Sequence, residues 1–272
     1  MYNELMTPSI CVIILARNVE QEIVPALKTA KHLTKDILIV DTGSTDSTIS
    51  VSRPYTKKVV YTSGNDFAAW RNLGAKHATA DWLLYLDSDE RLTPELVKEI
   101  NTTLENPRFS AYTIPRYEVL LGSHLSHWGD SRVIRLIRRD ALSRWVGKLH
   151  EQPKIDGTIG QLHYHLVHLT HKNFHEKLSG TLNWSLMEAE LLFAANHPPV
   201  IWWRFWRIML TEFWDRCVRR RLFLDGTEGW LEIIYQMFSR YLTYARLWEL
   251  QRQPTLEKTY QDIDKKLLAR FK

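Results

Sequence analysis

The sequence predicts an α/β protein with an open, mostly parallel sheet flanked by helices and with a C-terminal helical appendage. Through the first two thirds of the chain, apolar runs typical of buried strands alternate with helical patterns, which is the βαβ order of a largely parallel sheet. From about Phe174 the strand signals stop and long helical patterns follow. A chain of 272 residues, 44% of them hydrophobic, can bury a core of this kind without disulfides.

The first two predicted strands both end in polar residues. An apolar run from Ser9 ends at Ala16 and is followed by Asn18, and a second run from Ile37 ends at Asp41. The carboxyl ends of parallel strands lie on one edge of the sheet, where ligands bind. We therefore expect Ala16, Asn18 and Asp41 to face a nucleotide, with the Asp41 carboxylate accepting hydrogen bonds from a ribose or a base.

A third strand delivers two acids to the same edge. The stretch LLYLDSDERL, residues 83–92, is an apolar run that ends in Asp87, Ser88 and Asp89. Two carboxylates one residue apart suit Mg²⁺ or Mn²⁺, which also binds substrate phosphates. The alternative is a strand followed by a polar turn, in which Asp89 or Thr93 caps the next helix. The sequence predicts a nucleotide-diphosphate site without excluding this alternative.

The helix before that strand carries a basic residue of interest. Phe67, Trp70 and Leu73 form part of a helical apolar stripe, and Arg71 lies off this stripe. A guanidinium there can clamp a diphosphate with two hydrogen bonds, or it can be a solvated helix arginine. The chain has neither a GxGxxG motif nor a GxxxxGK[ST] motif, so a dinucleotide fingerprint and a P-loop are both excluded.

Several short motifs together carry a family resemblance. VDTGSTDST, FAAWRNLGAKHATADWLLYLDSDERL, IPRY, HWGDSRVIRLIRR, LHE and FLDGTEG occur in this order. The chain resembles glycosyltransferase family 2 with a GT-A fold, and within it the branch of bacterial lipopolysaccharide core β-glucosyltransferases. This resemblance implies an inverting transfer of a hexose, glucose in that branch, from a UDP-sugar to a glycan or glycolipid acceptor, with Mg²⁺ or Mn²⁺ as cofactor.

The resemblance also implies roles for individual residues on the donor side. Asp41 matches the acid that holds the uracil or ribose, and Arg71 matches the residue that reaches the diphosphate. Asp87 and Asp89 match the motif that binds the metal and the nucleotide, with Asp89 as the more direct metal ligand. The chain departs from the commoner DAD in having Ser88 between them.

Two acids compete for the role of catalytic base. Glu151, in the LHE triplet, stands where many relatives carry the base, while Asp130, in the Trp-Gly-Asp loop, is the rival. Five histidines are crowded between His163 and His175, but strand alternation prevents all of them from sharing one ion. Among them we expect His168 to lie near the metal.

The C-terminal third predicts three helices and a division of the chain into a catalytic domain, 1–173, and a helical region, 174–272. The expected helices run from Phe174 to Ala195, from Val200 to Arg221 and from Thr227 to Gln251. The second is rich in tryptophan on one face and in arginine on the other, a pattern typical of helices that lie in a membrane interface. The alternative is a helix packed on the catalytic domain.

Composition bears on location and partners. The net charge of +5 and the isoelectric point near 9.1 fit an acidic partner. Cys11 and Cys217 are far apart and Cys11 lies in a predicted buried strand, so no disulfide is expected and a reducing compartment fits. The first residues lack the pattern of a signal peptide. We expect a cytoplasmic protein that is peripheral on the inner face of the bacterial cytoplasmic membrane.

Two other classes of protein remain open at this point. A phosphatase of the haloacid dehalogenase type also places DxD after an apolar strand, although it would carry Thr or Val where this chain has Arg91. A basic, non-catalytic nucleic-acid binder could use the Trp-Arg helix, but recognisable binding modules are absent, so we expect no nucleic-acid partner. Release of UDP from a UDP-sugar would distinguish a glycosyltransferase from the phosphatase. Salt-dependent oligonucleotide binding would favour the nucleic-acid binder.

Overall fold

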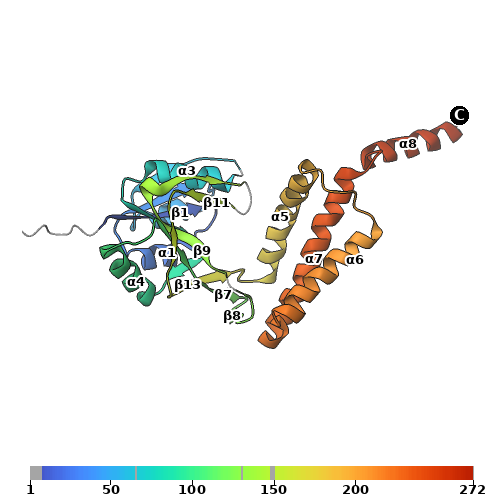
Figure 1. Ribbon diagram of the computed structural model, residues 1–272. Helices are drawn as coiled ribbons and strands as arrows, with labels where there is room; N and C mark the ends of the chain where they lie inside the picture. The colour runs from blue at the N-terminus through green and yellow to red at the C-terminus, as the bar shows by residue number, and fades with distance from the viewer. Residues whose placement is uncertain (1–7, 65, 130, 148–150, 272) are drawn as a thin grey trace, which may run out of the picture. The chain divides into compact units, whose positions relative to one another are not determined.

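The computed structural model describes residues 8–64, 66–129, 131–147 and 151–271, and these fall into two compact units. The first unit holds residues 8–122 and 131–170, and the second holds residues 123–129 and 171–271. Strands and short helices make up the first unit, whereas long helices dominate the second (Figure 1).

A seven-stranded sheet runs through the α/β unit. Its strands, in spatial order, are β12 (Ile159–Gln161), β6 (Ala111–Ile114), β9 (Val133–Arg138), β4 (Trp82–Asp87), β1 (Ile10–Ala16), β2 (Ile37–Asp41) and β3 (Lys58–Tyr61). The neighbours from β4 to β3 are parallel, as are β12 and β6. Only β9, of the strands described here, runs antiparallel to both of its neighbours. The prediction of an open, mostly parallel sheet is confirmed.

The register of the parallel strands brings their polar ends together. Ala16 pairs with Asp41 across β1 and β2, and Leu15 pairs with Asp87 across β1 and β4. Parallel strands that start in register also end in register, because the rise per residue is the same in each. The convergence expected for Ala16, Asp41 and Asp87 is therefore present at one edge of the sheet.

Helices cover the two faces of this sheet because successive strand residues point to opposite sides. The helices of this unit are α1 (Ile23–Ala30), α2 (Thr48–Ser52), α3 (Phe67–His77) and α4 (Pro94–Glu105). Val12 and Ile14 of β1 belong to the apolar cluster that contains α1 and α4, whereas Ile13 belongs to the cluster that contains α3. The two clusters form two core layers, one on each side of the sheet.

Two smaller sheets complete the α/β unit. In one, β13 (Leu166–Thr170) lies antiparallel to β5 (Glu90–Leu92) and parallel to β7 (Arg116–Leu120). The other is a hairpin of β10 (Leu142–Val146) and β11 (Gln152–Ile155). In the first of them His168 stands opposite Glu90 and opposite Glu118. This register brings a histidine and two acids next to the end of β4.

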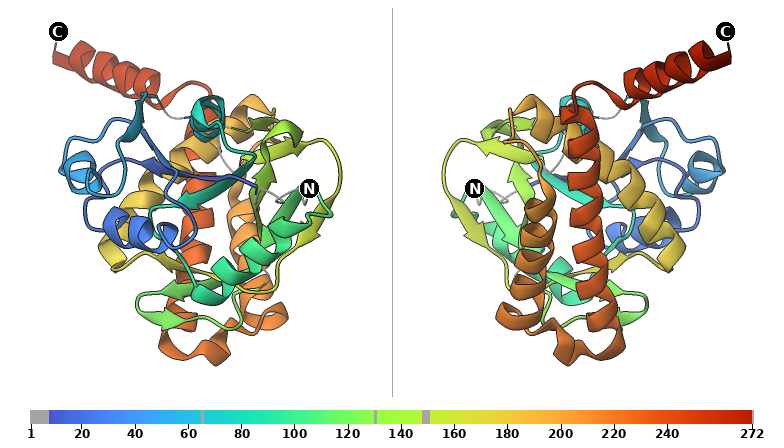
Figure 2. Two further views of the ribbon diagram at one scale, coloured as in Figure 1. Left: turned by 90° about the vertical axis from the view of Figure 1, so that its left-hand side faces the viewer. Right: turned by 90° about the vertical axis from the view of Figure 1, so that its right-hand side faces the viewer.

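The second unit consists mainly of α5 (Phe174–Ala194), α6 (Trp202–Phe213), α7 (Gly226–Gln251) and α8 (Leu256–Leu268), with the short strand β8 (Ser123–His124). Both α5 and α6 pack against α7 (Figure 2). The predicted helix from Val200 to Arg221 is wrong at its end, because the α-helix stops at Phe213 and a π-helical turn follows over Trp214–Arg219. The sequence pattern did not predict α8.

The segment 123–129 belongs to the helical unit because two residues of that unit hold it. Asp225 accepts hydrogen bonds from the His127 backbone N–H at 2.9 Å and pairs with the His127 ring at 2.7 Å. Arg220 donates to the Trp128 carbonyl at 2.6 Å.

Among the described residues no helix is both long and apolar enough to cross a membrane. Both cysteines are buried and unpaired, as expected.

Two glycines give opposite predictions for substitution by alanine. A Cβ on Gly74 in α3 would lie 2.6 Å from Ile13 Cγ2, whereas one on Gly180 in α5 would meet its nearest atom, Trp184 Nε1, at 3.5 Å. Overpacking costs about 1–3 kcal/mol, more than the roughly 1 kcal/mol that alanine gains over glycine in a helix. We expect Gly74→Ala to lower the melting temperature of the full chain and Gly180→Ala to raise it.

Circular dichroism during thermal unfolding measures both effects. A rise in melting temperature for Gly74→Ala would show that α3 does not approach β1 as closely as described.

Candidate functional site

The donor side of the predicted site is built on the ends of β1 and β2. The Thr42 N–H donates to the Ala16 carbonyl at 2.9 Å, and the Asp41 carboxylate accepts from the Ser44 N–H at 3.1 Å. Asn18 accepts from the Thr45 N–H at 2.8 Å and holds the left-handed conformation, with φ of 53°. The turn after β2 is thereby fastened to the end of β1, and Ala16, Asn18 and Asp41 lie together as predicted.

Two arginines hold the carboxylate of Asp87. Arg71 from α3 donates to Asp87 Oδ1 at 3.1 Å, and Arg135 from β9 binds Oδ2. Burial works against the charged form of Asp87, but Arg135 and Arg71 outweigh it and hold the pKa of this carboxyl well below its usual range. Asp87 is therefore a fixed anion whose two oxygens already have cationic partners.

Arg71 is more buried than its position on the helix predicted. It was expected to lie off the apolar stripe of α3, yet it is 3% exposed. The rings of Tyr85 and Trp145 lie 5.5 and 5.0 Å from its guanidinium carbon, which is close enough for cation–π attraction. These rings, supplied by β4 and β10, form a second apolar wall that the helical pattern alone does not reveal.

The same guanidinium also holds Glu151. Arg71 Nε donates to Glu151 Oε1 at 2.7 Å, and the Glu151 side chain is largely shielded from solvent. The Nη1 of Arg71 is buried and has no hydrogen-bond partner in the described part of the chain. Arg71 thus joins the predicted base to the DxD motif and keeps one donor unsatisfied.

Asp89, the second acid of the motif, has a different environment. Its side chain is 37% exposed, and one oxygen lies 3.3 Å from Nε2 of His168. The other ring nitrogen, Nδ1, lies 2.6 Å from Glu118. Burial alone would lower the pKa of the His168 imidazole, but hydrogen bonds and charges from Asp89 and Glu118 raise it to about 10. His168 orients Asp89 in this geometry, and its role as a metal ligand stays a prediction.

Several contributors to this site were not identified from the sequence. Glu90 is fully buried, accepts from Arg135 at 2.9 Å and also accepts from the Asp87 N–H at 2.9 Å. Burial raises the pKa of Glu90 in spite of Arg135, and Asp87 and Asp89 add to the rise. The available signals were the third acid in DSDE and an arginine inside the apolar strand VIRLIR.

The remaining predicted residues are placed as follows. The Ser88 carbonyl accepts from Arg91 at 2.7 Å, which holds the turn between the two acids. Thr93 caps α4 by accepting from the Leu96 N–H at 3.2 Å, as one alternative proposed. His163 pairs with Glu99, whereas His168 pairs with Glu118 and Asp89. Asp130 lies outside the described residues.

The residues that are present fit a divalent ion in a limited way. In the described residues no group of three or more His, Cys, Asp or Glu side chains could hold a metal. Both oxygens of Asp87 are paired with arginine, so Asp89 is the carboxylate best able to reach an ion. Mg²⁺ is commonly bound by one or two carboxylates together with substrate phosphates, and such a site requires no larger protein cluster.

Comparison with known proteins identifies the family. Residues 11–158, more than half of the chain, match the model of Glycosyl transferase family 2. The matched residues include both donor-side strand ends, the DxD motif and Glu151. The chain belongs to glycosyltransferase family 2, and its enzyme class is that of a glycosyltransferase. This membership decides against the phosphatase and against the non-catalytic binder.

Individual proteins are similar to this chain over different lengths. An uncharacterized glycosyltransferase of Rickettsia bellii is 22% identical over 287 residues, which cover 96% of this chain and 93% of the relative. A TPR repeat-containing protein of Synechococcus elongatus is 33% identical over 145 residues, and the match spans 53% of this chain but only 34% of that protein. S. aureus TarS residues 1–349, solved in complex with UDP-GlcNAc, has 14% identity, coverage of 93% and 92%, and a TM-score of 0.49.

The arginine pair on Asp87 predicts a contrast between two positions of β9. Arg135→Met would leave the buried Glu90 and Asp87 without their shared cation, which costs about 3–5 kcal/mol. Arg138→Met removes an arginine of the same strand whose partner, Asp140, is a surface residue, and we expect a change within about 0.5 kcal/mol. Urea denaturation of the full chain measures both, and equal shifts would contradict the buried network.

Proposed function

We propose that this chain is an inverting glycosyltransferase that moves a hexose, glucose as the first candidate, from a UDP-sugar to a glycan or glycolipid acceptor. The observation that carries this proposal is the guanidinium of Arg71. It contacts Asp87 at 3.1 Å and Glu151 at 2.7 Å. One buried cation thus links a donor-binding acid to the candidate base, within a unit that belongs to family 2.

On the donor side, Asp41 would bind the uracil or the ribose, with Ala16 and Asn18 shaping the pocket beside it. The buried Nη1 of Arg71, which has no partner among the described residues, would gain an acceptor from the diphosphate. Asp89 would bind Mg²⁺ or Mn²⁺, with Asp87 and Ser88 beside it and His168 orienting its carboxylate. A bound divalent ion would neutralise the charge that develops on the leaving diphosphate.

On the acceptor side, Glu151 would act as the general base. Its carboxylate takes the proton of the acceptor hydroxyl while that oxygen attacks the anomeric carbon. The bond between the anomeric carbon and the diphosphate oxygen breaks, and UDP leaves with the electron pair. A single displacement from the far side inverts the anomeric centre, so no nucleophile of the enzyme is required.

The finer assignments rest on the resemblance of the motifs. Lipopolysaccharide core is the acceptor that the family branch suggests, with residues 1–173 as the catalytic domain and 174–272 as a region that meets the membrane or the acceptor. The tryptophan-rich, arginine-rich sequence of α6 supports a peripheral position on a membrane surface. We propose the inner face of the bacterial cytoplasmic membrane as the location.

A donor screen tests the reaction directly. The full chain, Mn²⁺ and several nucleotide sugars are combined, and thermal shift and UDP release are measured. Stabilisation by UDP-glucose above the other sugars, with release of UDP when acceptor is added, supports the proposal. Release of inorganic phosphate, or no response to any nucleotide sugar, contradicts it.

Asp89→Ala is expected to abolish the metal dependence of UDP binding and to leave the fold intact. Asp89 is partly exposed and has only His168 as a described partner of its carboxylate, so little packing is lost. The control is Asp140→Ala, a surface acid of the same unit. Calorimetric titration of UDP with and without Mn²⁺ gives the answer, and an unchanged metal effect in Asp89→Ala would remove this residue from the site.

Glu151→Gln is expected to lower turnover by roughly a hundred- to ten-thousand-fold, the usual contribution of a general base. The amide keeps the shape and can still contact Arg71, so the affinity for the UDP-sugar should stay close to that of the wild type. Steady-state kinetics and donor titration measure the two effects separately.

Asp130→Asn is the matched comparison for the base, and we expect the milder loss there. Near-normal turnover in Glu151→Gln with an inactive Asp130→Asn would reverse the assignment. Full turnover in both variants would rule out a single-base mechanism at this site.

A further inference from the structure

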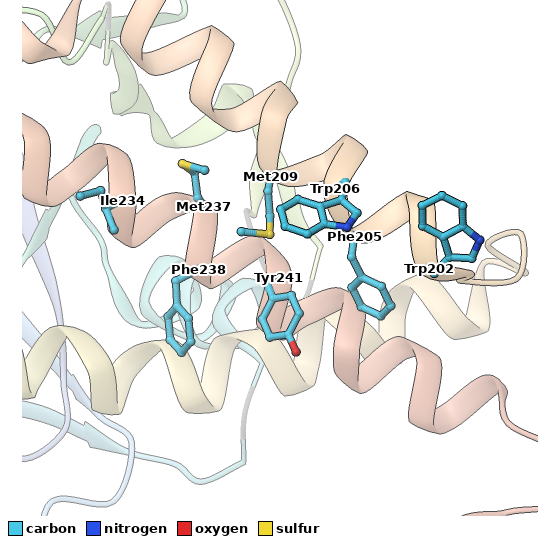
Figure 3. Close-up of a pocket in the computed structure, with 8 residues that line it drawn as sticks. All are labelled: Trp202, Phe205, Trp206, Met209, Ile234, Met237, Phe238 and Tyr241. Atoms are coloured by element: carbon cyan, nitrogen blue, oxygen red, sulfur yellow. The ribbon is translucent and has the colours of Figure 1, made fainter.

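An open apolar groove lies between α6 and α7 in the helical unit. Its volume is about 630 Å³, within the roughly 300–1,000 Å³ typical of small-ligand pockets. Figure 3 shows that both helices supply its walls, with Trp202, Trp206 and Met209 from α6 and Ile234, Phe238 and Tyr241 from α7. No charged side chain lines it.

The apolar side chains that line the groove are unusually exposed to solvent. Trp202 is 75% exposed and Trp206 is 62% exposed, and no residue of α6 is buried. Large apolar patches on a protein surface mark contact with a partner, a ligand or a membrane. Covering these side chains removes a large apolar area from water, so a ligand that fills the groove gains free energy from their burial.

The charges around the groove indicate which kind of ligand this is. From Trp202 to Arg221 the chain carries six arginines, of which three pair with Glu212 and Asp215. Arg204 and Arg207 stack on Trp203, with 5.1 and 5.8 Å between guanidinium carbon and ring centroid. Apolar tryptophans beside arginines on one helix match the boundary between acyl chains and anionic headgroups of a bilayer.

A second apolar stripe in the same unit supports a lipid. Helix α8 buries none of its residues, and Tyr260, Ile263 and Leu267 are exposed on it at helical spacing, while its three lysines are balanced by Glu257, Asp262 and Asp264. A lipid surface would cover both of these exposed apolar faces.

We propose that the groove between α6 and α7 binds an acyl chain of an anionic phospholipid, while the arginines that follow along α6 and the π-helical turn meet its phosphate. This inference rests on the membrane association proposed above and adds a defined site to it. The acyl chain would enter the groove between Trp206 and Phe238, and the lipid headgroup would stay in the membrane interface.

The test compares the substitutions Phe238→Glu and Leu186→Glu, which stand at similarly exposed positions. Phe238 in the groove is 44% exposed, and Leu186 on α5, outside the groove, is 46% exposed. The full chain is floated with phosphatidylcholine vesicles that contain or lack phosphatidylglycerol. We expect the wild type to float only with phosphatidylglycerol, Phe238→Glu to bind roughly tenfold more weakly or worse, and Leu186→Glu to bind like the wild type.

A second readout places the acyl chain. Phosphatidylglycerol brominated on its acyl chains should quench the wild-type tryptophan fluorescence more than that of a Trp202→Phe/Trp206→Phe variant, although the chain has 11 tryptophans. Equal losses of flotation in Phe238→Glu and Leu186→Glu, or equal quenching in both proteins, would overturn the groove as the site.

The same experiments distinguish a lipid in the groove from a second protein copy, and they test the groove separately from the donor site. A concentration-dependent dimer that Phe238→Glu dissolves, in a protein that does not float, would assign the groove to a second copy of the chain and overturn the lipid. Titration of UDP with Mn²⁺ should be unchanged in every groove variant. A wild type that binds UDP normally but does not float therefore rejects only the lipid proposal, whereas a wild type that floats without binding UDP rejects only the donor site.

Discussion

The pairing of Asp87 with two buried arginines is the interaction on which the α/β site depends. A carboxylate at the end of a buried strand is costly unless cations and hydrogen bonds compensate it. Arg71 arrives from α3 and Arg135 from β9, and the Asp87 N–H is bonded to Glu90. Helix α3 and strand β9 are thus held against the tip of β4 by one charge. The same network positions Glu151, because Nε of Arg71 donates a hydrogen bond to its carboxylate.

This network divides the two acids of the DxD motif between different tasks. Asp87 has no oxygen without a guanidinium partner, and its pKa is held low by Arg135 and Arg71 in spite of burial. Asp89 is more exposed and faces His168. A divalent ion would therefore meet Asp89 more readily than Asp87, and a nucleotide would have to supply several of its oxygen ligands. Two identical side chains one residue apart acquire different chemistry from their neighbours alone.

The sequence could predict the strand ends but not this network. Apolar runs in βαβ order place Ala16, Asp41 and Asp87 on one edge, because parallel strands share a direction and a rise per residue. The burial of Arg71 could not be predicted, since it depends on Tyr85 and Trp145, which come from two other strands. Arg135 escaped notice because β9 inserts antiparallel between β4 and β6. Such a pairing has long sequence separation and leaves no local pattern.

In the helical unit, the sequence predicted where most helices lie but not which of their apolar faces are buried. Hydrophobic spacing predicted α5 and α7 closely, yet α6 ends early in a π-helical turn. An amphipathic helix in a globular protein is held chiefly by burial of its apolar face. On α7 that condition is met, since Ile233, Tyr235 and Leu247 are buried, whereas α6 buries no residue at all. The apolar face of α6 is thus only partly covered, through Phe205 and Ile208. The anionic lipid proposed above would cover the rest of this face and meet the arginines of the same helix.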